Sequence, residues 1–220
     1  MVIVPSVLVA QVPIANPGLP DHEILRYTET IGSVRHPFEA TLNLVTDGSP
    51  HYEYHAVGTE LETIFHLEPK NLLSFWSQMV TKEADVTVVR TSEYRHLKAK
   101  AEADQLVVTD LGSLAVVLRG FPWGQTSYAK LEYLGNTTYT GPGIEFELKV
   151  EGRESVVTEA ATWECWHVTT GLSGALGLVL PKTHWWFSVD GTHPLVKMSG
   201  PVGGPGSPTR TLSLASDSLH

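Results

Sequence analysis

Residues 38–57 read F-E-A-T-L-N-L-V-T-D-G-S-P-H-Y-E-Y-H-A-V, and this stretch decides the fold class. Along 38–44, apolar residues occupy the even positions and polar residues the odd positions. A period of two is typical of a strand that buries one face. The Asp47-Gly48 pair that follows favours a hairpin turn. The stretch therefore predicts two antiparallel strands, at 38–46 and 50–57.

Further segments outside this hairpin have strand character. Val, Thr, Tyr and Trp dominate them, and these residue types suit a pleated surface. We expect strands at 22–31, 61–67, 73–80, 85–91, 94–100, 105–109, 126–134, 145–150, 155–169, 183–189 and 194–199. Only Leu111–Arg119 has a helical pattern, and Gly120 and Pro122 end it.

Without long helices to cover its apolar face, a sheet must curl or pair with a second sheet. The sequence thus predicts an all-β fold with a curved, mostly antiparallel sheet. We expect a half-barrel or open barrel with at most one short helix.

The chain of 220 residues fits a single β domain flanked by two arms. We assign 1–20 to an N-terminal arm or signal remnant, 21–200 to the β domain and 201–220 to a flexible C-terminal tail rich in Pro and Gly. The apolar run Met1–Gln11 fits either the end of a signal peptide or an edge strand. No run approaches the roughly 18 apolar residues of a membrane helix, so no integral membrane segment is expected.

The charge and the cysteine content exclude several function classes. The formal net charge is −9, and an acidic surface opposes binding to nucleic acid, which requires clustered Lys and Arg. A single cysteine, Cys165, excludes an intrachain disulfide framework and a cysteine-rich zinc site.

Five segments, in order along 22–200, carry short motifs. They are H-E-I-L-R-Y-T at 22–28, L-E-P-K-N-L-L at 67–73, Leu114–Gly124, T-E-A-A-T-W-E-C-W at 158–166, and Trp185–Lys197. Together they resemble a bacterial group, domain-of-unknown-function family 3108. The resemblance implies an exported β-rich domain with a curved antiparallel sheet, similar to those of lipoprotein carriers. It assigns no catalytic residue.

The segment His51–His55 is the first candidate site. In a strand, His51, Glu53 and His55 share one face, and Tyr54 lies on the other. The two histidines would lie about 13 Å apart, too far to bind one ion together. We take His51, Glu53 and Tyr54 as candidate catalytic residues for acid–base chemistry. The alternative is a polar outer face of a hairpin.

His167 and His184 form the second candidate site, with His193 nearby in the sequence. The first two fall on consecutive candidate strands and would meet if those strands pair. Imidazole groups suit transition metals, so His167 and His184 are candidate metal ligands and a transition metal is a candidate cofactor. An acid–base role and ordinary strand histidines are the alternatives.

Six tryptophans are candidate ligand-binding residues: Trp76, Trp123, Trp163, Trp166, Trp185 and Trp186. Trp163 and Trp166 differ in parity, as do Trp185 and Trp186, so each strand would place one indole on each face. One set would fill the core, and the other would line a concave groove. The alternative is that both faces are simply covered.

Three functions stay open from the sequence. The first is an extracytoplasmic domain, periplasmic or secreted, that binds an apolar, amphipathic or glycan-like small ligand on a curved sheet. The second is an enzyme that acts on an extracellular glycan or ester through the histidine, glutamate and tyrosine candidates or a metal. The third is a structural subunit that self-associates through its terminal arms.

Overall fold

The computed structural model describes residues 14–59, 61–83, 86–93, 106–108, 111–133, 144–177, 179–202 and 206–215. The apolar run Met1–Gln11 and the expected strand 94–100 lie outside these residues.

The described residues form one sheet of thirteen strands. The strands are β1 (His22–Ile31), β2 (Val34–Val45), β3 (His51–Val57), β4 (Leu61–Leu67), β5 (Ser74–Glu83), β6 (Val86–Glu93), β7 (Leu106–Val108), β8 (Tyr128–Tyr133), β9 (Ile144–Val157), β10 (Thr162–Leu172), β11 (Thr183–Ser188), β12 (Leu195–Pro201) and β13 (Thr209–Leu214). Their spatial order is β6-β5-β4-β3-β2-β1-β13-β12-β11-β10-β9-β8-β7. Of these neighbouring pairs, β7 and β8 run parallel, and the others run antiparallel.

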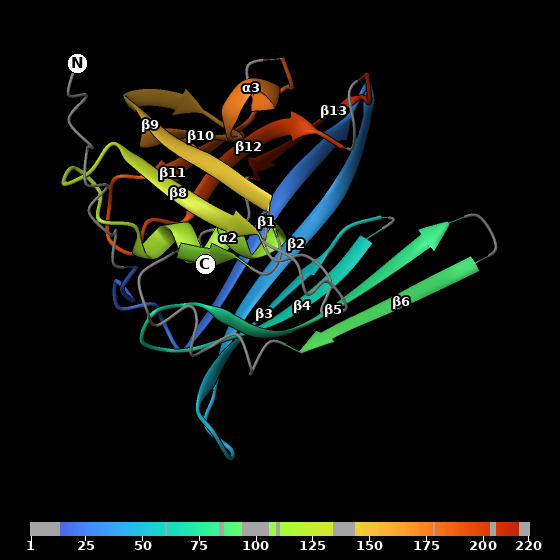
Figure 1. Cartoon of the computed structure of the whole chain (residues 1–220). Coiled ribbons are helices and arrows are strands. Elements are labelled where there is room, and N and C mark those ends of the chain that lie inside the picture. The colour runs from blue at the N-terminus through green and yellow to red at the C-terminus, as the bar shows by residue number, and fades with distance from the viewer. Residues whose placement is uncertain are drawn as a thin grey trace, which may run out of the picture.

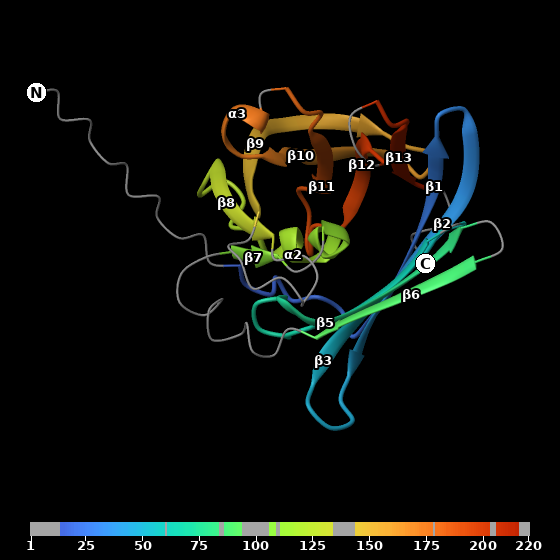
Figure 2. The same cartoon turned by 45° about the vertical axis from the view of Figure 1, so that its right-hand side comes forward.

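The sheet is open and strongly curled. Strands β6 and β7 stand at the two ends of the order, so the described sheet does not close into a barrel. Strands β8–β13 curve around a short helical segment, while β2–β6 extend away as a flatter wing (Figures 1 and 2). The predicted fold class, a curved and mostly antiparallel open sheet, is confirmed.

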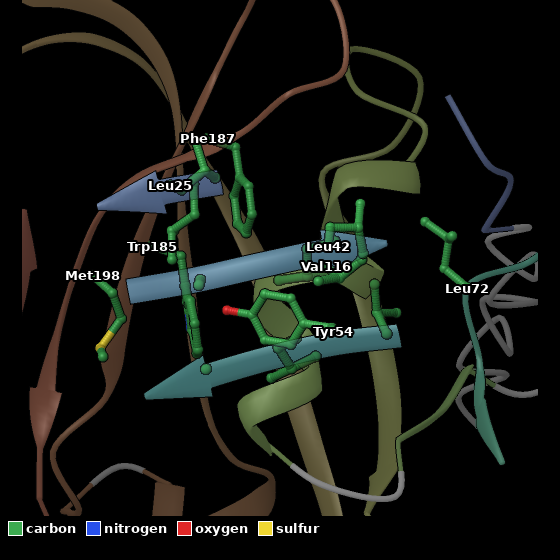
Figure 3. Close-up of a cluster of buried hydrophobic side chains, with 14 of the residues drawn as sticks. Leu25, Leu42, Tyr54, Leu72, Val116, Trp185, Phe187 and Met198 are labelled. Atoms are coloured by element: carbon green, nitrogen blue, oxygen red, sulfur yellow. The ribbon is translucent and has the colours of Figure 1, made fainter. Parts of the chain in front are cut away.

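The burial pattern separates an inner face, which holds the core, from an outer face. In β3, Tyr52, Tyr54 and Ala56 are buried, and the residues between them are partly exposed. The same alternation in β1 and β4 places a mainly apolar layer on the inner face, interrupted by the buried Glu29 and Thr63, because alternate residues of a strand share a face. Figure 3 shows this core, in which Leu42 of β2 and Tyr54 of β3 belong to the same cluster as Trp185 and Phe187.

The helical segment fills the inside of the curl. It consists of a 3₁₀ turn at Leu111–Ser113, the helix α2 (Leu114–Val117) and a second 3₁₀ turn at Leu118–Gly120. Leu114, Val116, Val117 and Leu118 are at most 1% exposed, so the segment covers part of the inner face. A single turn, α3 (Gly174–Gly177), follows β10. Within the described part of the chain, no helix is long and apolar enough to cross a membrane.

The expected strand at 155–169 is wrong in one respect, because it is two strands. Strand β9 ends at Val157 and β10 begins at Thr162. Between them, the Thr158 hydroxyl accepts a hydrogen bond from the Ala160 N–H at 3.2 Å, and the Thr158 N–H donates to the Ala161 carbonyl at 2.9 Å. A threonine hydroxyl that bonds the backbone two residues ahead stabilises a turn, and this turn reverses the chain.

The expected flexible tail at 201–220 is also wrong for 209–214. This segment is β13, which lies between β1 and β12. Leu212 and Leu214 are 5% and 0% exposed, so the strand contributes to the core. The Pro- and Gly-rich stretch before it connects two neighbouring strands.

The described end of the N-terminal arm packs against the body of the protein. The Ala15 N–H donates to the Gly120 carbonyl at 3.1 Å, and the Asn16 N–H donates to the Lys70 carbonyl at 3.0 Å. Leu19 is only 6% exposed and belongs to the core. Residues 14–20 have no regular structure, but these bonds and this burial hold them in place.

Candidate functional site

A cavity of about 300 Å³ lies on the inner face. Residues from β1–β5, the helical segment and β11–β13 line it, which is why no single stretch of sequence predicts it. Its wall is mainly apolar and aromatic, and includes Tyr27, Phe38, Tyr54, Met79 and Trp185. A mainly apolar wall with a few polar groups is typical of a small-molecule site.

The polar groups of this wall are few, and two of them are bonded within the protein. The Tyr27 hydroxyl donates to the Leu195 carbonyl at 2.9 Å, and the Trp185 indole N–H donates to the Thr170 hydroxyl at 2.9 Å. Burial raises the pKa of Tyr54 to about 12, so its hydroxyl stays protonated at neutral pH and is able to donate. Figure 3 shows this hydroxyl directed toward Trp185.

One charged residue, Arg210, also lines the cavity. Its guanidinium forms an ion pair with Glu29, whose side chain is 5% exposed, and lies 5.3 Å from the ring of Phe38. The two charges balance each other in a site of low polarity. The Glu29 carboxylate, which is not among the residues that line the cavity, therefore compensates the charge of Arg210.

The six candidate tryptophans go to different places, and of them only Trp185 lines the cavity. Trp123 and Trp166 stack with ring centroids 5.8 Å apart, and the Arg153 guanidinium lies 4.2 Å from the Trp166 ring centroid. The Trp163 indole donates to the Thr158 hydroxyl at 3.3 Å.

Trp76 and Trp186 stack on histidines of the outer face. Trp185 is 6% exposed in the core, while its neighbour Trp186 lies on the opposite face. The prediction that this strand places one indole on each face is therefore confirmed.

The first candidate site divides between two faces of the sheet. Tyr54 lies in the core, whereas His51 and Glu53 alternate with it and lie on the outer face. There, the His51 ring lies 4.5 Å from the ring of His66, and the His66 Nε2 lies 3.5 Å from a Glu53 oxygen. The structure does not bring His51, Glu53 and Tyr54 together around one substrate atom.

Sequence reasoning missed His66, the centre of this outer cluster. Its ring also stacks on Trp76, with centroids 4.5 Å apart. Burial, together with the neighbouring His51, lowers the pKa of His66. The signal that would find this residue is the β3–β4 register, which pairs Glu53 with His66.

The second candidate site does assemble. The His167 Nε2 lies 2.9 Å from the His184 Nδ1, so the two rings share a hydrogen bond. The Trp186 ring stacks on His167 with a centroid distance of 4.8 Å and an interplanar angle of 10°. Burial and the neighbouring His167 lower the pKa of His184, which favours its neutral form.

The Glu154 carboxylate lies beside this pair, whereas the third candidate histidine, His193, does not. A Glu154 oxygen lies 3.6 Å from the His167 Nδ1 and accepts the indole N–H of Trp186. His193 is separate, since its Nδ1 bonds the Ser188 carbonyl at 2.8 Å. Among the residues that the structure describes, no group of three or more His, Cys, Asp or Glu side chains gathers as a metal site.

Comparisons with known proteins show low similarity. No family model matches the chain, and no curated protein matches it. A solved β-barrel-like protein of the domain-of-unknown-function family DUF1849 from Brucella abortus aligns with a TM-score of 0.41 and 10% identity, over 88% of this chain and 95% of that one. A candidate lipoprotein from Parabacteroides distasonis aligns with a TM-score of 0.27 and 9% identity, over 93% of this chain and 97% of that one. The resemblance to family 3108 stays a prediction.

Proposed function

We propose that the protein is an extracytoplasmic binding domain that holds an apolar or amphipathic small ligand in the cavity of its inner face. The observation that carries this proposal is the cavity of about 300 Å³ with its mainly apolar and aromatic wall. Small-molecule pockets span about 300–1,000 Å³, so the cavity suits a small ligand. The extracytoplasmic location rests on the motif resemblance.

The wall favours an apolar ligand over a glycan. A sugar would bring many hydroxyl groups against residues such as Phe38, Met79 and Leu111. Each buried hydroxyl that lacks a partner costs about 1–3 kcal/mol. A ligand with an apolar body and one hydrogen-bond acceptor fits better, because the Tyr54 hydroxyl is available as a donor and Arg210 is balanced by Glu29.

A cavity-filling variant tests this function. Ala115 lines the cavity, so Ala115→Leu places extra methyl groups inside it, whereas Ala161→Leu adds the same groups to an exposed turn. A dye that shares the cavity with these methyl groups would overpack it, and overpacking costs about 1–3 kcal/mol. We therefore expect binding of an apolar fluorescent dye to weaken about tenfold in Ala115→Leu alone. The measurement is a dye titration, with native mass spectrometry of the wild-type protein for a co-purified ligand.

Two results would contradict a binding function of the cavity. If Ala115→Leu folds with an unchanged melting temperature and binds the dye as tightly as Ala161→Leu does, then the cavity is not the binding site. A wild-type protein that takes up no dye and carries no co-purified ligand would also contradict the proposal. Self-association through the arms and an enzymatic role for the histidine sites stay predictions.

A further inference from the structure

We propose that His167 and His184 form a binding site for one divalent transition-metal ion on the outer face of the sheet, with Glu154 as a positioning residue. The site lies on the face opposite to the cavity wall residue Trp185, because His184 and Trp186 alternate with Trp185 along β11. The proposal is independent of the proposed cavity function.

Strand pairing brings the two imidazoles together. In the β10–β11 ladder, His167 is paired with Trp186 and His184 with Thr169. The two histidines are thus diagonal neighbours on one face, a relation that long or aromatic side chains bridge. Their ring centroids lie 5.2 Å apart with an interplanar angle of 27°, so the rings meet edge to edge through their nitrogen atoms.

The nitrogen atoms are almost at the spacing that a metal requires. The His167 Nε2 and His184 Nδ1 are 2.9 Å apart. Two nitrogen ligands of a tetrahedral ion, each at about 2.0–2.1 Å from the metal, lie about 3.3 Å from each other. The pair therefore has to open by only a few tenths of an ångström. On ligation the proton between the two nitrogens would move through solvent to the His184 Nε2, so that each imidazole stays neutral and keeps one N–H.

Glu154 and Trp186 hold the His167 ring in the orientation that ligation needs. The carboxylate lies 3.6 Å from the His167 Nδ1, on the side of the ring away from His184, and it favours a proton on that nitrogen. The Nε2 lone pair then faces His184, as in the carboxylate–histidine–metal arrangement of known metal sites. Trp186 stacks on the same ring and donates its indole N–H to Glu154, which fixes the carboxylate.

Two imidazoles form an open site. Among the described residues no third His, Cys, Asp or Glu completes a ligand set, so water or an external ligand would fill the remaining positions. Imidazole suits copper, zinc and nickel, and Cu²⁺ binds most tightly of the divalent first-row ions. We therefore expect Cu²⁺ to bind more tightly than Zn²⁺ at this site.

Metal titration of the tag-free full chain tests the site. We expect one Cu²⁺ per chain in isothermal calorimetry, together with quenching of tryptophan fluorescence, because Trp186 stacks on both rings. His167→Gln and His184→Gln should each abolish this binding. The matched control is His66→Gln, which removes a histidine from the other outer-face cluster and should leave the titration unchanged.

The Glu154→Gln variant tests the positioning role. It keeps an oxygen for the Trp186 indole and removes the charge beside the His167 Nδ1. Loss of such an outer partner weakens metal affinity about 10–100-fold, and we expect an effect at the low end of this range. The ¹⁵N chemical shifts of the His167 ring should also show a larger share of the Nε2-protonated form, which a merely structural residue would not change.

Two results would overturn the proposal. One is a wild-type chain that shows no saturable Cu²⁺ or Zn²⁺ binding, which would make the pair a simple hydrogen bond between two imidazoles. The other is binding that survives in both His167→Gln and His184→Gln, which would place the ion elsewhere on the chain.

Discussion

Arg119 is the residue that fastens the helical segment to the sheet. Its guanidinium binds both carboxylate oxygens of Glu23 and donates to the carbonyl and the hydroxyl of Thr192, each at 2.8 Å. The Arg119 side chain is 3% exposed, so this charge is stable only because its partners surround it. One side chain thus joins the end of the helical segment, the start of β1 and the loop before β12.

Replacing this arginine tests the anchor. We expect Arg119→Met to lower the free energy of unfolding by about 3 kcal/mol, because it leaves the Glu23 carboxylate, 18% exposed, without its partner. The double variant Arg119→Met, Glu23→Gln should recover part of the loss. Urea unfolding measures both. Equal stability of the wild type and the single variant would show that the ion pair does not anchor the segment.

The outer cluster around His66 makes stability depend on pH. The pKa of the His66 side chain in the folded protein lies below the ordinary value of 6.5, chiefly because the side chain is partly buried. The unfolded chain therefore binds more protons than the folded protein as the pH falls below 6.5, and stability declines until the pH passes the folded pKa. We expect urea midpoints to fall as the pH is lowered through 6.5, and to fall less in His66→Gln. An equal decline in both proteins would contradict this role.

At the scale of elements, local patterns predict strands well but miss those that depend on distant partners. Strands β1 and β4 have the expected bounds, because alternation and turn residues mark them in the sequence. Strand β13 is short and follows a Pro- and Gly-rich stretch, so its local pattern favours a tail. Its burial comes from β1 and β12, which contact it on either side.

The same distinction between local patterns and distant partners explains which parts of the candidate sites could be predicted from the sequence. The meeting of His167 and His184 follows from the pairing of two consecutive strands, so the sequence was sufficient to anticipate it. The alternation rule likewise separates Tyr54 from Glu53. The cavity and the His66 cluster depend on the curl of the sheet and on an exact register, and neither leaves a local pattern.

Replacing Gly120 tests whether its contact with Ala15 holds the segment 14–20 in place. A Cβ at this position would lie 2.3 Å from the Ala15 carbonyl oxygen, and that atom belongs to the backbone, which cannot rotate away. Gly120→Ala should therefore displace the segment and lower the free energy of unfolding by about 1–3 kcal/mol. We expect faster amide hydrogen exchange at Ala15 and Asn16, whose N–H groups bond Gly120 and Lys70.

Gly171→Ala is the matched control, because the three atoms nearest its new Cβ all belong to the side chain of Lys182, which can move. If both variants unfold at the wild-type urea concentration and the exchange at Ala15 is unchanged, then the segment is not held by this contact.

At the scale of the whole molecule, β13 joins two runs of strands. Strands β1–β6 follow each other in space as they do in sequence, and so do β8–β12. Strand β13 lies between these runs and hydrogen-bonds to both. Its apolar residues Leu212 and Leu214 belong to the same core as Tyr27 and Met198. The single sheet therefore depends on its last described strand.

Truncation tests this dependence. Removing residues 209–220 should abolish the cooperative thermal transition, because β1 and β12 each lose a row of hydrogen bonds and Leu212 and Leu214 leave the core. Removing only 216–220 is the control, since it keeps β13. Circular dichroism during heating measures both. A single sharp transition in the longer truncation would show that the two runs hold together without β13.

The position of β13 also has a consequence for the order of folding. Each of the two runs of strands pairs neighbours along the chain, so both can form early with little loss of chain entropy. The pairing of Tyr27 with Leu214 spans almost the whole sequence and has to form late. During synthesis the first six strands leave the ribosome with the edge of β1 still unpaired. Until β13 pairs with it, that edge is an additional unpaired strand edge, besides the outer edge of β6, at which the growing chain is exposed to aggregation and to chaperones.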